Sequence, residues 1–265
     1  ALPENAWLLE PIRTAPATYT VAFPTAFDHD ATPALTLHFA DDLVEATLGD
    51  RPLPFSANGD GSFATLPPLG RGMHALSFRT VRSDLPGKPL VWLKGAFTLQ
   101  SAAPYGPGPN RTLRTAGPFT AGLAAIDPAT ELVAAGLPFL HQTLRAEATF
   151  MLTSPAARLA FSSVQADALH LTIDGRPHGW IWGPDWSLTL ASPLAAGPHR
   201  LQVALVPSTY NHFGPHHYYN GDWHVVSPGQ VVGDKNFADP DDAPARTHIP
   251  EWHFKPLRLP ASVCA

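Results

Sequence analysis

Hydrophobic and polar residues alternate in short runs along this chain, a pattern that predicts β-strands with one face turned toward a core. Clusters of Gly, Pro, Asn and Asp separate the runs. Short strands divided by frequent turns are typical of sandwiches and barrels. We therefore predict strands at residues 19–23, 34–39, 75–81, 90–99, 146–152, 169–173 and 200–206.

Signals for helices are weak. The 265 residues include 20 Gly and 30 Pro, and proline interrupts a helix wherever it falls in the interior. The best helical start is at Asp127 and Pro128, which have the residue types of an N-cap and a first helical position. We predict a helical insertion of one or two turns near residue 128 within an all-β chain.

An internal repeat organises the pattern further. Residues 48–52 (LGDRP) match residues 173–177 (IDGRP) at an offset of 125 residues. The same offset, without a gap, aligns five more pairs: Leu69 with Leu194, Gly72 with Gly197, His74 with His199, Leu76 with Leu201, and Phe78 with Val203. Several matches in one register indicate two copies of a single β unit.

The repeat divides the chain into two predicted domains. The segment 104–112 is rich in Pro and Gly and has no periodicity, which is typical of a linker. We predict a first β-sandwich at residues 1–103 and a second at 113–265, whose C-terminal tail returns to supply the last strand.

Composition and charge exclude several classes of function. Hydrophobic residues make up 45% of the chain, which is enough for packed cores. The net charge is −5 and the basic residues are scattered singly, so no nucleic-acid partner is expected. The sequence has no apolar stretch of about 20 residues, so no membrane-spanning segment is predicted. Cys264 is the single cysteine, which excludes an intrachain disulfide. The first residues have no features of a signal peptide.

Three tryptophans distinguish the second copy. Trp180 aligns with Phe55, so an aromatic ring occupies this position in both copies and is predicted to pack in the core. Trp182 and Trp186 instead align with small residues of the loop 57–61. Flat rings with an N–H donor suit the apolar face of a sugar, so both are predicted to stack on carbohydrate. The alternative is that they cover a seam between the domains or the C-terminal tail.

A second candidate region is the stretch 210–224, which holds four of the 13 histidines together with several Tyr and Trp residues. Three interpretations stay open: a carbohydrate site, a metal site that includes Asp222, and an ordered structural loop. The carbohydrate interpretation predicts that sugar hydroxyls are bound by His212, His216, His217, Tyr218, Tyr219 and Trp223.

Several segments resemble those of a known family in the same order along the chain. They are residues 91–99, 135–139, 146–150, 211–217 with 221–222 and 226–228, and 251–259. This succession resembles the galactose-binding-like jelly rolls in the non-catalytic C-terminal regions of large glycoside hydrolases, including α-L-rhamnosidase-like and family-2-type enzymes.

The resemblance implies two tandem jelly-roll β-sandwiches of the galactose-binding-like type, which in such enzymes usually follow a catalytic barrel. It also implies a carbohydrate partner, a catalytic glycoside hydrolase domain as a further partner, and a secreted or periplasmic location. Such sandwiches often hold a structural Ca²⁺, although its ligands are frequently backbone carbonyls that a sequence does not reveal. No other cofactor is expected.

Catalytic motifs are scarce. The sequence has neither a Gly-x-Ser-x-Gly elbow nor a phosphate-binding loop, and no pair of acidic residues stands out as a glycosidase pair. We therefore name no catalytic residue and favour a non-catalytic module that binds carbohydrate during polysaccharide breakdown. The alternatives are purely structural support of a larger glycoside hydrolase, and a polysaccharide-active enzyme with its own site in residues 210–224.

Overall fold

The computed structural model describes residues 2–58, 61–81, 89–108, 111–213 and 251–264. Within these ranges nearly all regular elements are strands. The helical elements described are the 3-10 turn η1 (His29–Ala31) and the short helix α1 (Thr209–Phe213). The prediction of an all-β sandwich is confirmed.

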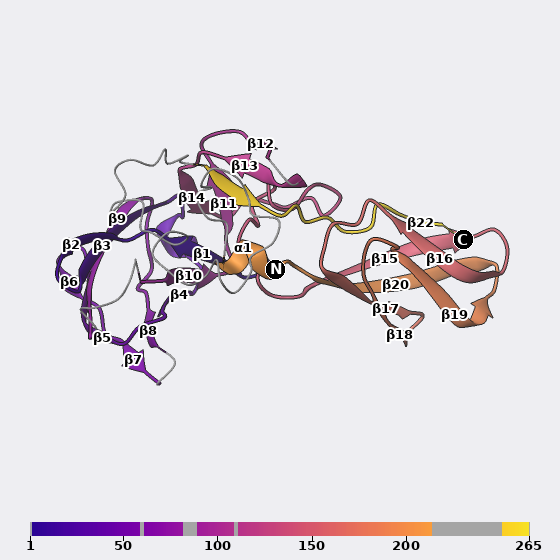
Figure 1. The fold of residues 1–265 in the computed structure, drawn as a ribbon, viewed down its shortest axis with the longest axis horizontal. Helices are drawn as coiled ribbons and strands as arrows, with labels where there is room; N and C mark the ends of the chain where they lie inside the picture. The colour runs from indigo at the N-terminus through magenta and orange to yellow at the C-terminus, as the bar shows by residue number, and fades with distance from the viewer. Residues whose placement is uncertain (1, 59–60, 82–88, 109–110, 214–250, 265) are drawn as a thin grey trace, which may run out of the picture.

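Two sheets make up what we call the first strand group, at one end of the molecule (Figure 1). The five-stranded sheet has the order β1 (Asn5–Leu9), β10 (Val91–Gly95), β4 (Leu35–Phe39), β8 (Ser62–Thr65) and β7 (Ser56–Ala57). The other has the order β11 (Thr98–Ser101), β14 (Phe119–Gly122), β3 (Thr18–Thr25), β9 (Gly72–Thr80), β5 (Leu43–Leu48) and β6 (Arg51–Pro52), with β2 (Ile12–Ala15) beside β3.

Large side chains from both sheets meet in the core of the first strand group. The ring of Trp7 in β1 lies 6.4 Å from that of Phe23 in β3, and Phe39 in β4 lies 5.1 Å from Phe78 in β9. All four side chains are buried. In β3, β4 and β9 buried residues alternate with less buried ones, which explains the periodicity of the sequence, because successive side chains in a strand point to opposite faces.

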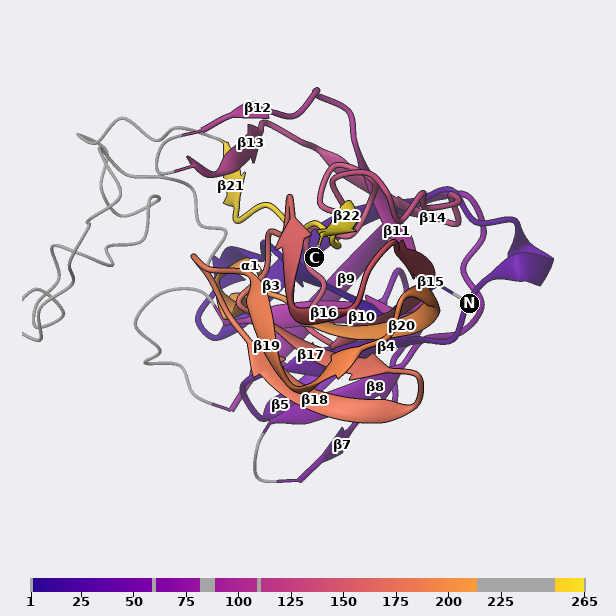
Figure 2. The same ribbon diagram turned by 90° about the vertical axis from the view of Figure 1, so that its right-hand side faces the viewer.

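Two further sheets form the second strand group, at the other end of the molecule (Figure 1). The four-stranded sheet has the order β15 (Leu144–Leu152), β20 (Gly197–Val206), β17 (Ala168–Ile173) and β18 (Arg176–Ile181). The three-stranded sheet has the order β19 (Ser187–Leu194), β16 (Ala156–Ser162) and β22 (Ser262–Cys264). A view along the long axis places these strands in front of the first strand group (Figure 2).

Strand order corresponds between the two groups. The path β3-β9-β5-β6 matches β15-β20-β17-β18, and β10-β4-β8 matches β22-β16-β19. Leu48 pairs with Leu76, and the residues 125 positions later, Ile173 and Leu201, also pair. These pairings agree with the register of the sequence matches, while the tandem repeat itself stays a prediction.

The aligned histidines illustrate the same correspondence. Each histidine donates a hydrogen bond from Nε2 to the carbonyl oxygen four residues earlier, at 3.1 Å for His74 and 2.9 Å for His199. Each ring also lies against a phenylalanine on the neighbouring strand, Phe23 in one case and Phe150 in the other. The matched residues therefore have matched local surroundings.

The C-terminal tail runs along both strand groups and is the yellow segment of Figure 1. Its first strand, β21 (Trp252–Phe254), completes a small sheet with β12 (Gly106–Pro107) and β13 (Leu113–Thr115). Its last strand, β22, pairs with β16 in the second strand group. The tail thus connects strands that lie far apart in the molecule.

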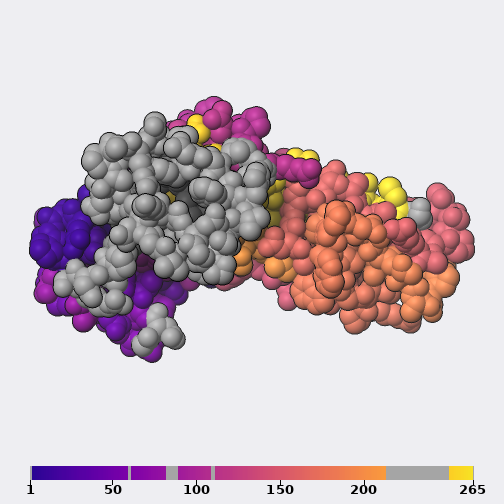
Figure 3. All heavy atoms as spheres, viewed as in Figure 1, coloured from indigo at the N-terminus to yellow at the C-terminus, as the bar shows by residue number. Residues whose placement is uncertain are grey.

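The domain limits, with domains at residues 1–103 and 113–265 and a linker at 104–112, stay predictions. Strand pairing shows with which strands the residues near these limits associate. The segment predicted as a linker contains β12, and β14 pairs with β11 and β3 of the first strand group. The surface view shows the resulting elongated shape, with residues of the second strand group at one end (Figure 3).

Two local predictions need correction. The run 90–99 forms two strands, β10 and β11, in different sheets, and the chain turns between them, where the Phe97 N–H donates to the carbonyl oxygen of Gly95 at 3.1 Å. The helix predicted near residue 128 is absent, since residues 128–130 and 132–136 form turns. The Asp127 carboxylate still accepts a hydrogen bond from the Ala129 N–H, in a turn rather than a helix.

Candidate functional site

An exposed aromatic pair lies on the outer face of the four-stranded sheet. Leu169 and Leu171 of β17 are buried, so His170 between them points outward. Its cross-strand partner on the edge strand β18 is Trp180, with ring centroids 4.9 Å apart. Trp180 is 52% exposed, so the prediction that it packs in the core is wrong. Among the described strands, β18 pairs with β17 alone and so forms an edge of the sheet.

Trp182 extends the same aromatic surface. It follows β18 by one residue and is 64% exposed, whereas Ile181 between the two tryptophans is buried. Alternation therefore places Trp180 and Trp182 on the same side of the strand. Together with His170, they form what we call the aromatic face.

Trp186 has a different environment from the one predicted. It is partly buried and packs against the hydrophobic core. Its ring also covers Gly183, where an added Cβ would lie 3.1 Å from Cζ2 of the ring. Trp182 and Trp186 therefore do not form one exposed pair, and the partner of Trp182 on the surface is Trp180.

Hydrogen-bonding side chains continue the outer face across the sheet. Register places Trp180, His170, Ala204 and Arg145 in one row across four strands. Ala204 lies between His170 and the exposed Arg145 in this row, and its small side chain projects little from the sheet.

The neighbouring row carries a polar network. Glu147 accepts hydrogen bonds from Arg200 and, at 2.6 Å, from Gln202. The hydrogen bond from Arg200 is the main reason that the pKa of Glu147 lies below its usual value. Apolar rings beside ionised and amide groups are the combination that recognises a ligand with both apolar and hydroxyl-rich faces.

His212, also predicted to bind sugar, is packed against the first strand group. It lies in α1, and its ring stacks between Trp92 of β10 and His141, with centroid distances of 5.5 and 5.0 Å. The Trp92 Nε1–H donates to the carbonyl oxygen of His212 at 3.3 Å. Asn211 fixes the same helix to the tail, because its side chain both donates to and accepts from the backbone of Lys255.

The surroundings of His212 disfavour positive charge. Burial, followed by the charges of nearby groups including Lys94, lowers the pKa of His38 and of His212 to about 4. Burial and Lys94 also lower the pKa of His141, while Glu4 opposes that shift. Burial lowers the pKa of Lys94 itself. These histidines are therefore neutral near pH 7, and among the described residues no group of His, Cys, Asp and Glu side chains is arranged to hold a metal ion.

Neutral histidines in the folded protein make its stability sensitive to acid. The unfolded chain binds a proton at His38 near pH 6.5, whereas the folded chain binds it only near pH 4. The contribution of neutral His38 to stability is therefore fully present above pH 6.5 and is lost as the pH falls toward 4. After allowance for partial exposure, we expect the stability of the wild type relative to His38→Gln to fall by about 1.5 kcal/mol between pH 7 and 4.5.

Urea unfolding at both pH values measures this difference. His29→Gln serves as the control, since His29 is exposed in η1. A stability difference between wild type and His38→Gln that does not change with pH would contradict the prediction.

His199 behaves in the opposite way. Its Nδ1 lies 2.7 Å from the Asp174 carboxylate, and its Nε2 lies 2.9 Å from the carbonyl oxygen of Ala195. The Asp174 hydrogen bond is the main cause of a raised pKa for His199, because acceptors at both nitrogens favour the doubly protonated ring. With both nitrogens engaged, this ring is held as a hydrogen-bond donor within the hairpin rather than as a free base.

The remaining predicted site residues, His216, His217, Tyr218, Tyr219 and Trp223, lie outside the described residues. Asp222 of the metal interpretation does so as well. No helix in the described part of the chain is long and apolar enough to span a membrane.

Comparison with known proteins gives distant likenesses. No protein-family model and no curated protein matches this chain. One similar structure is a rhamnosidase from Novosphingobium sp. PP1Y, with 14% identity, a TM-score of 0.27, and an overlap of 80% of this chain with 21% of that chain. Another is a GH2 β-galacturonidase from Eisenbergiella tayi bound to galacturonate, with 10% identity, a TM-score of 0.23, and an overlap of 78% with 36%. The chain therefore spans only about a fifth and about a third of these two proteins.

Proposed function

We propose that this chain is a non-catalytic module that binds carbohydrate through the aromatic face of the second strand group. The observation that carries the proposal is the exposure of Trp180 and Trp182 on one side of an edge strand. Exposed indole rings lose contact with water when a sugar ring stacks on them, and their N–H groups can bind hydroxyls. A protein rarely leaves two adjacent tryptophans exposed for stability alone, because burial would be more favourable.

Polar groups on the same face fit this function. Arg145 stands in the same row as Trp180, and the network of Glu147, Arg200 and Gln202 lies in the next rows. Donors and acceptors on a rigid sheet match the hydroxyl pattern of a glycan at little cost in conformational entropy. The proposed ligand is an oligo- or polysaccharide, since in the described part of the chain the aromatic face lies at an edge of the sheet, where a long ligand can continue past β18.

The natural context proposed for such a module is an enzyme of polysaccharide breakdown that acts outside the cytoplasm. In this proposal a catalytic glycoside hydrolase domain is the partner, and the module holds it close to its substrate. The link raises the effective concentration of the catalytic domain at the glycan without new catalytic residues. A structural Ca²⁺ remains part of the proposal, with no ligands assigned.

Structural support of a larger enzyme is the second candidate function. It is favoured by exposed apolar side chains in the first strand group, namely Ile12, Met73 and Val81, which are 61%, 67% and 62% exposed. Such residues suit contact with another domain. This function requires no glycan binding, so the experiment below separates the two candidates.

Binding of the chain to a broad glycan array with calcium present tests the proposal. Trp180→Ala should weaken binding to the recognised glycan about 10- to 100-fold, because burial of a large apolar side chain contributes about 1.5–3 kcal/mol. Trp182→Ala should have a similar effect. The change is measured by isothermal titration with the glycan that the array identifies.

Met151→Ala is the matched control, because Met151 is 65% exposed on β15 of the same sheet but lies outside the aromatic face. Its affinity should equal that of the wild type. Binding that survives both tryptophan substitutions would place the site elsewhere, and a blank array would favour structural support.

A further inference from the structure

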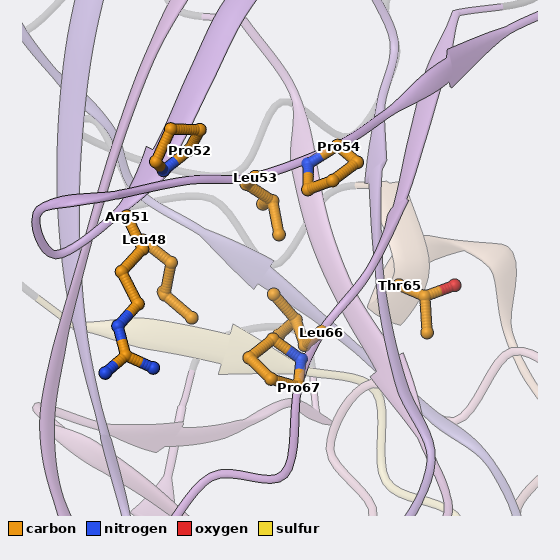
Figure 4. Close-up of a pocket in the computed structure, with 8 residues that line it drawn as sticks. All are labelled: Leu48, Arg51, Pro52, Leu53, Pro54, Thr65, Leu66 and Pro67. Carbon is orange, nitrogen blue, oxygen red and sulfur yellow. The ribbon is translucent and has the colours of Figure 1, made fainter.

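The first strand group contains a cavity of about 420 Å³ beside the β5–β6 hairpin (Figure 4). This volume is in the range of small-molecule sites. Leu48 and Arg51 lie on one side of the opening, Leu53 lies above it, and Leu66 lies on the opposite side. The cavity is distant in sequence from the aromatic face and is independent of the function proposed above.

The walls of this cavity are apolar and stiff. The lining residues Leu53 and Leu66 are buried, and Leu48 is half-buried. Three prolines and Thr65 complete the lining, and the proline rings fix the backbone dihedral angle φ. A wall of this kind is formed before a ligand arrives, so binding costs little ordering of the protein.

Arg51 gives the cavity its charge. Its side chain is exposed at the opening, and within the described part of the chain its guanidinium has no ion pair or side-chain hydrogen bond. Leu48 pairs with Arg51 across the hairpin, so the position of the arginine is set by the β5–β6 turn. The opening therefore combines an apolar wall with one available cation.

The aligned arginine of the second strand group differs in this respect. Arg176 occupies the corresponding hairpin, but Asp174 lies close enough for the two charges to interact. The residue aligned with Asp174 is Gly49, and the carboxylate of the first hairpin is instead that of Asp50, next to Arg51 in the sequence. Arg176 does not line the cavity, so it is the matched position against which the role of Arg51 can be tested.

We infer that this cavity binds a small carboxylate with an apolar ring or chain. The apolar part would lie against Leu48, Leu53 and Leu66, and the carboxylate would accept hydrogen bonds from Arg51. A guanidinium matches a carboxylate in a two-pronged geometry, which makes this pairing stronger than a neutral hydrogen bond. A neutral ligand of the same shape lacks that contribution.

Phenylacetate and phenylacetamide are suitable probes, because they have nearly the same shape and differ in charge. Titration is followed by NMR on protein labelled at the leucine methyl groups. Phenylacetate should shift the methyl signals of Leu48, Leu53 and Leu66, with an affinity at least about tenfold higher than that of phenylacetamide.

Arg51→Gln tests the charge directly. Arg51 is exposed on a hairpin, so the variant should fold, and it should bind phenylacetate no better than the wild type binds phenylacetamide. Arg176→Gln is the matched control and should bind phenylacetate like the wild type. The inference is overturned if phenylacetate does not bind, if both probes bind equally, if the shifts lie elsewhere, or if the two variants behave alike.

Discussion

Replacing Phe254 with alanine is expected to lower the free energy of unfolding by about 4 kcal/mol, the usual scale for removing a fully buried aromatic ring. Phe254 has no exposed surface, and its ring lies within a cluster formed with Phe119, Phe139 and Trp252. The ring meets Phe139 edge to face at 5.2 Å. Loss of Phe254 would leave a cavity bordered by these rings, which cannot close without moving several strands.

Chemical denaturation of the wild type and the variant measures this effect. Phe254→Leu should cost less, because leucine refills part of the space. Phe63→Ala is a matched control on a half-buried phenylalanine of β8 and should also cost less. A loss below about 1 kcal/mol for Phe254→Ala would mean that the tail does not anchor the fold through this ring.

The anchoring role follows from the path of the tail. Beyond β21, the backbone of Leu257 accepts a hydrogen bond from Leu132 N–H and donates one to the carboxylate of Glu131. Arg258 then exchanges backbone hydrogen bonds with Gln165, before β22 joins β16. The tail is therefore bound in turn to the first strand group, to the turns after residue 128, and to the second strand group.

Strand positions were largely predictable because burial in a sandwich imposes a period of two. The runs at 19–23, 169–173 and 200–206 lie within β3, β17 and β20. The repeat offset also agreed with hairpin pairing, since Leu48 and Ile173 end equivalent strands. The period of two is a local signal that determines which side of a strand is buried, and the repeat compares two segments of the chain without requiring any knowledge of how they pack.

Contacts between distant segments could not be predicted in this way. His212 looked like a surface residue in an aromatic loop, but it meets Trp92, which is 120 residues earlier. The sequence also did not indicate that His38 and His141 lie near His212, because their proximity depends on how distant segments pack. No periodic pattern encodes such a neighbour.

The aromatic face was predicted in part. Exposure of Trp182 agreed with its alignment to a small loop residue. Trp180 was assigned to the core because Phe55 aligns with it, yet Phe55 is half-buried and Trp180 is exposed on an edge strand. Phe55 also lies between β6 and β7, whereas Trp180 lies within β18, so the shared aromatic residue type indicated neither a shared strand position nor a shared degree of burial.

Replacing Asn5 with alanine should destabilise the protein by about 3 kcal/mol, through unpaired hydrogen-bonding groups rather than lost volume. Asn5 is fully buried at the start of β1. Its Nδ2 donates to the carbonyl oxygen of Gly136 at 3.0 Å, and its Oδ1 accepts from the Phe139 N–H at 3.1 Å. The side chain thus joins the first strand to a turn more than 130 residues away.

Alanine cannot replace these bonds, and the buried Phe139 N–H would have no acceptor at that position. Asn5→Asp keeps the acceptor but replaces the donor to Gly136 with a charged oxygen. Near pH 7 it should lower the free energy of unfolding at least as much as Asn5→Ala. In acid the carboxyl is protonated and the loss should be smaller. Gln142→Ala, an exposed amide, is the control and should change stability by less than about 0.5 kcal/mol. Denaturation at pH 7 and pH 4 distinguishes these cases. Equal stability of the wild type and Asn5→Ala would show that the contact between β1 and the turn forms without this side chain.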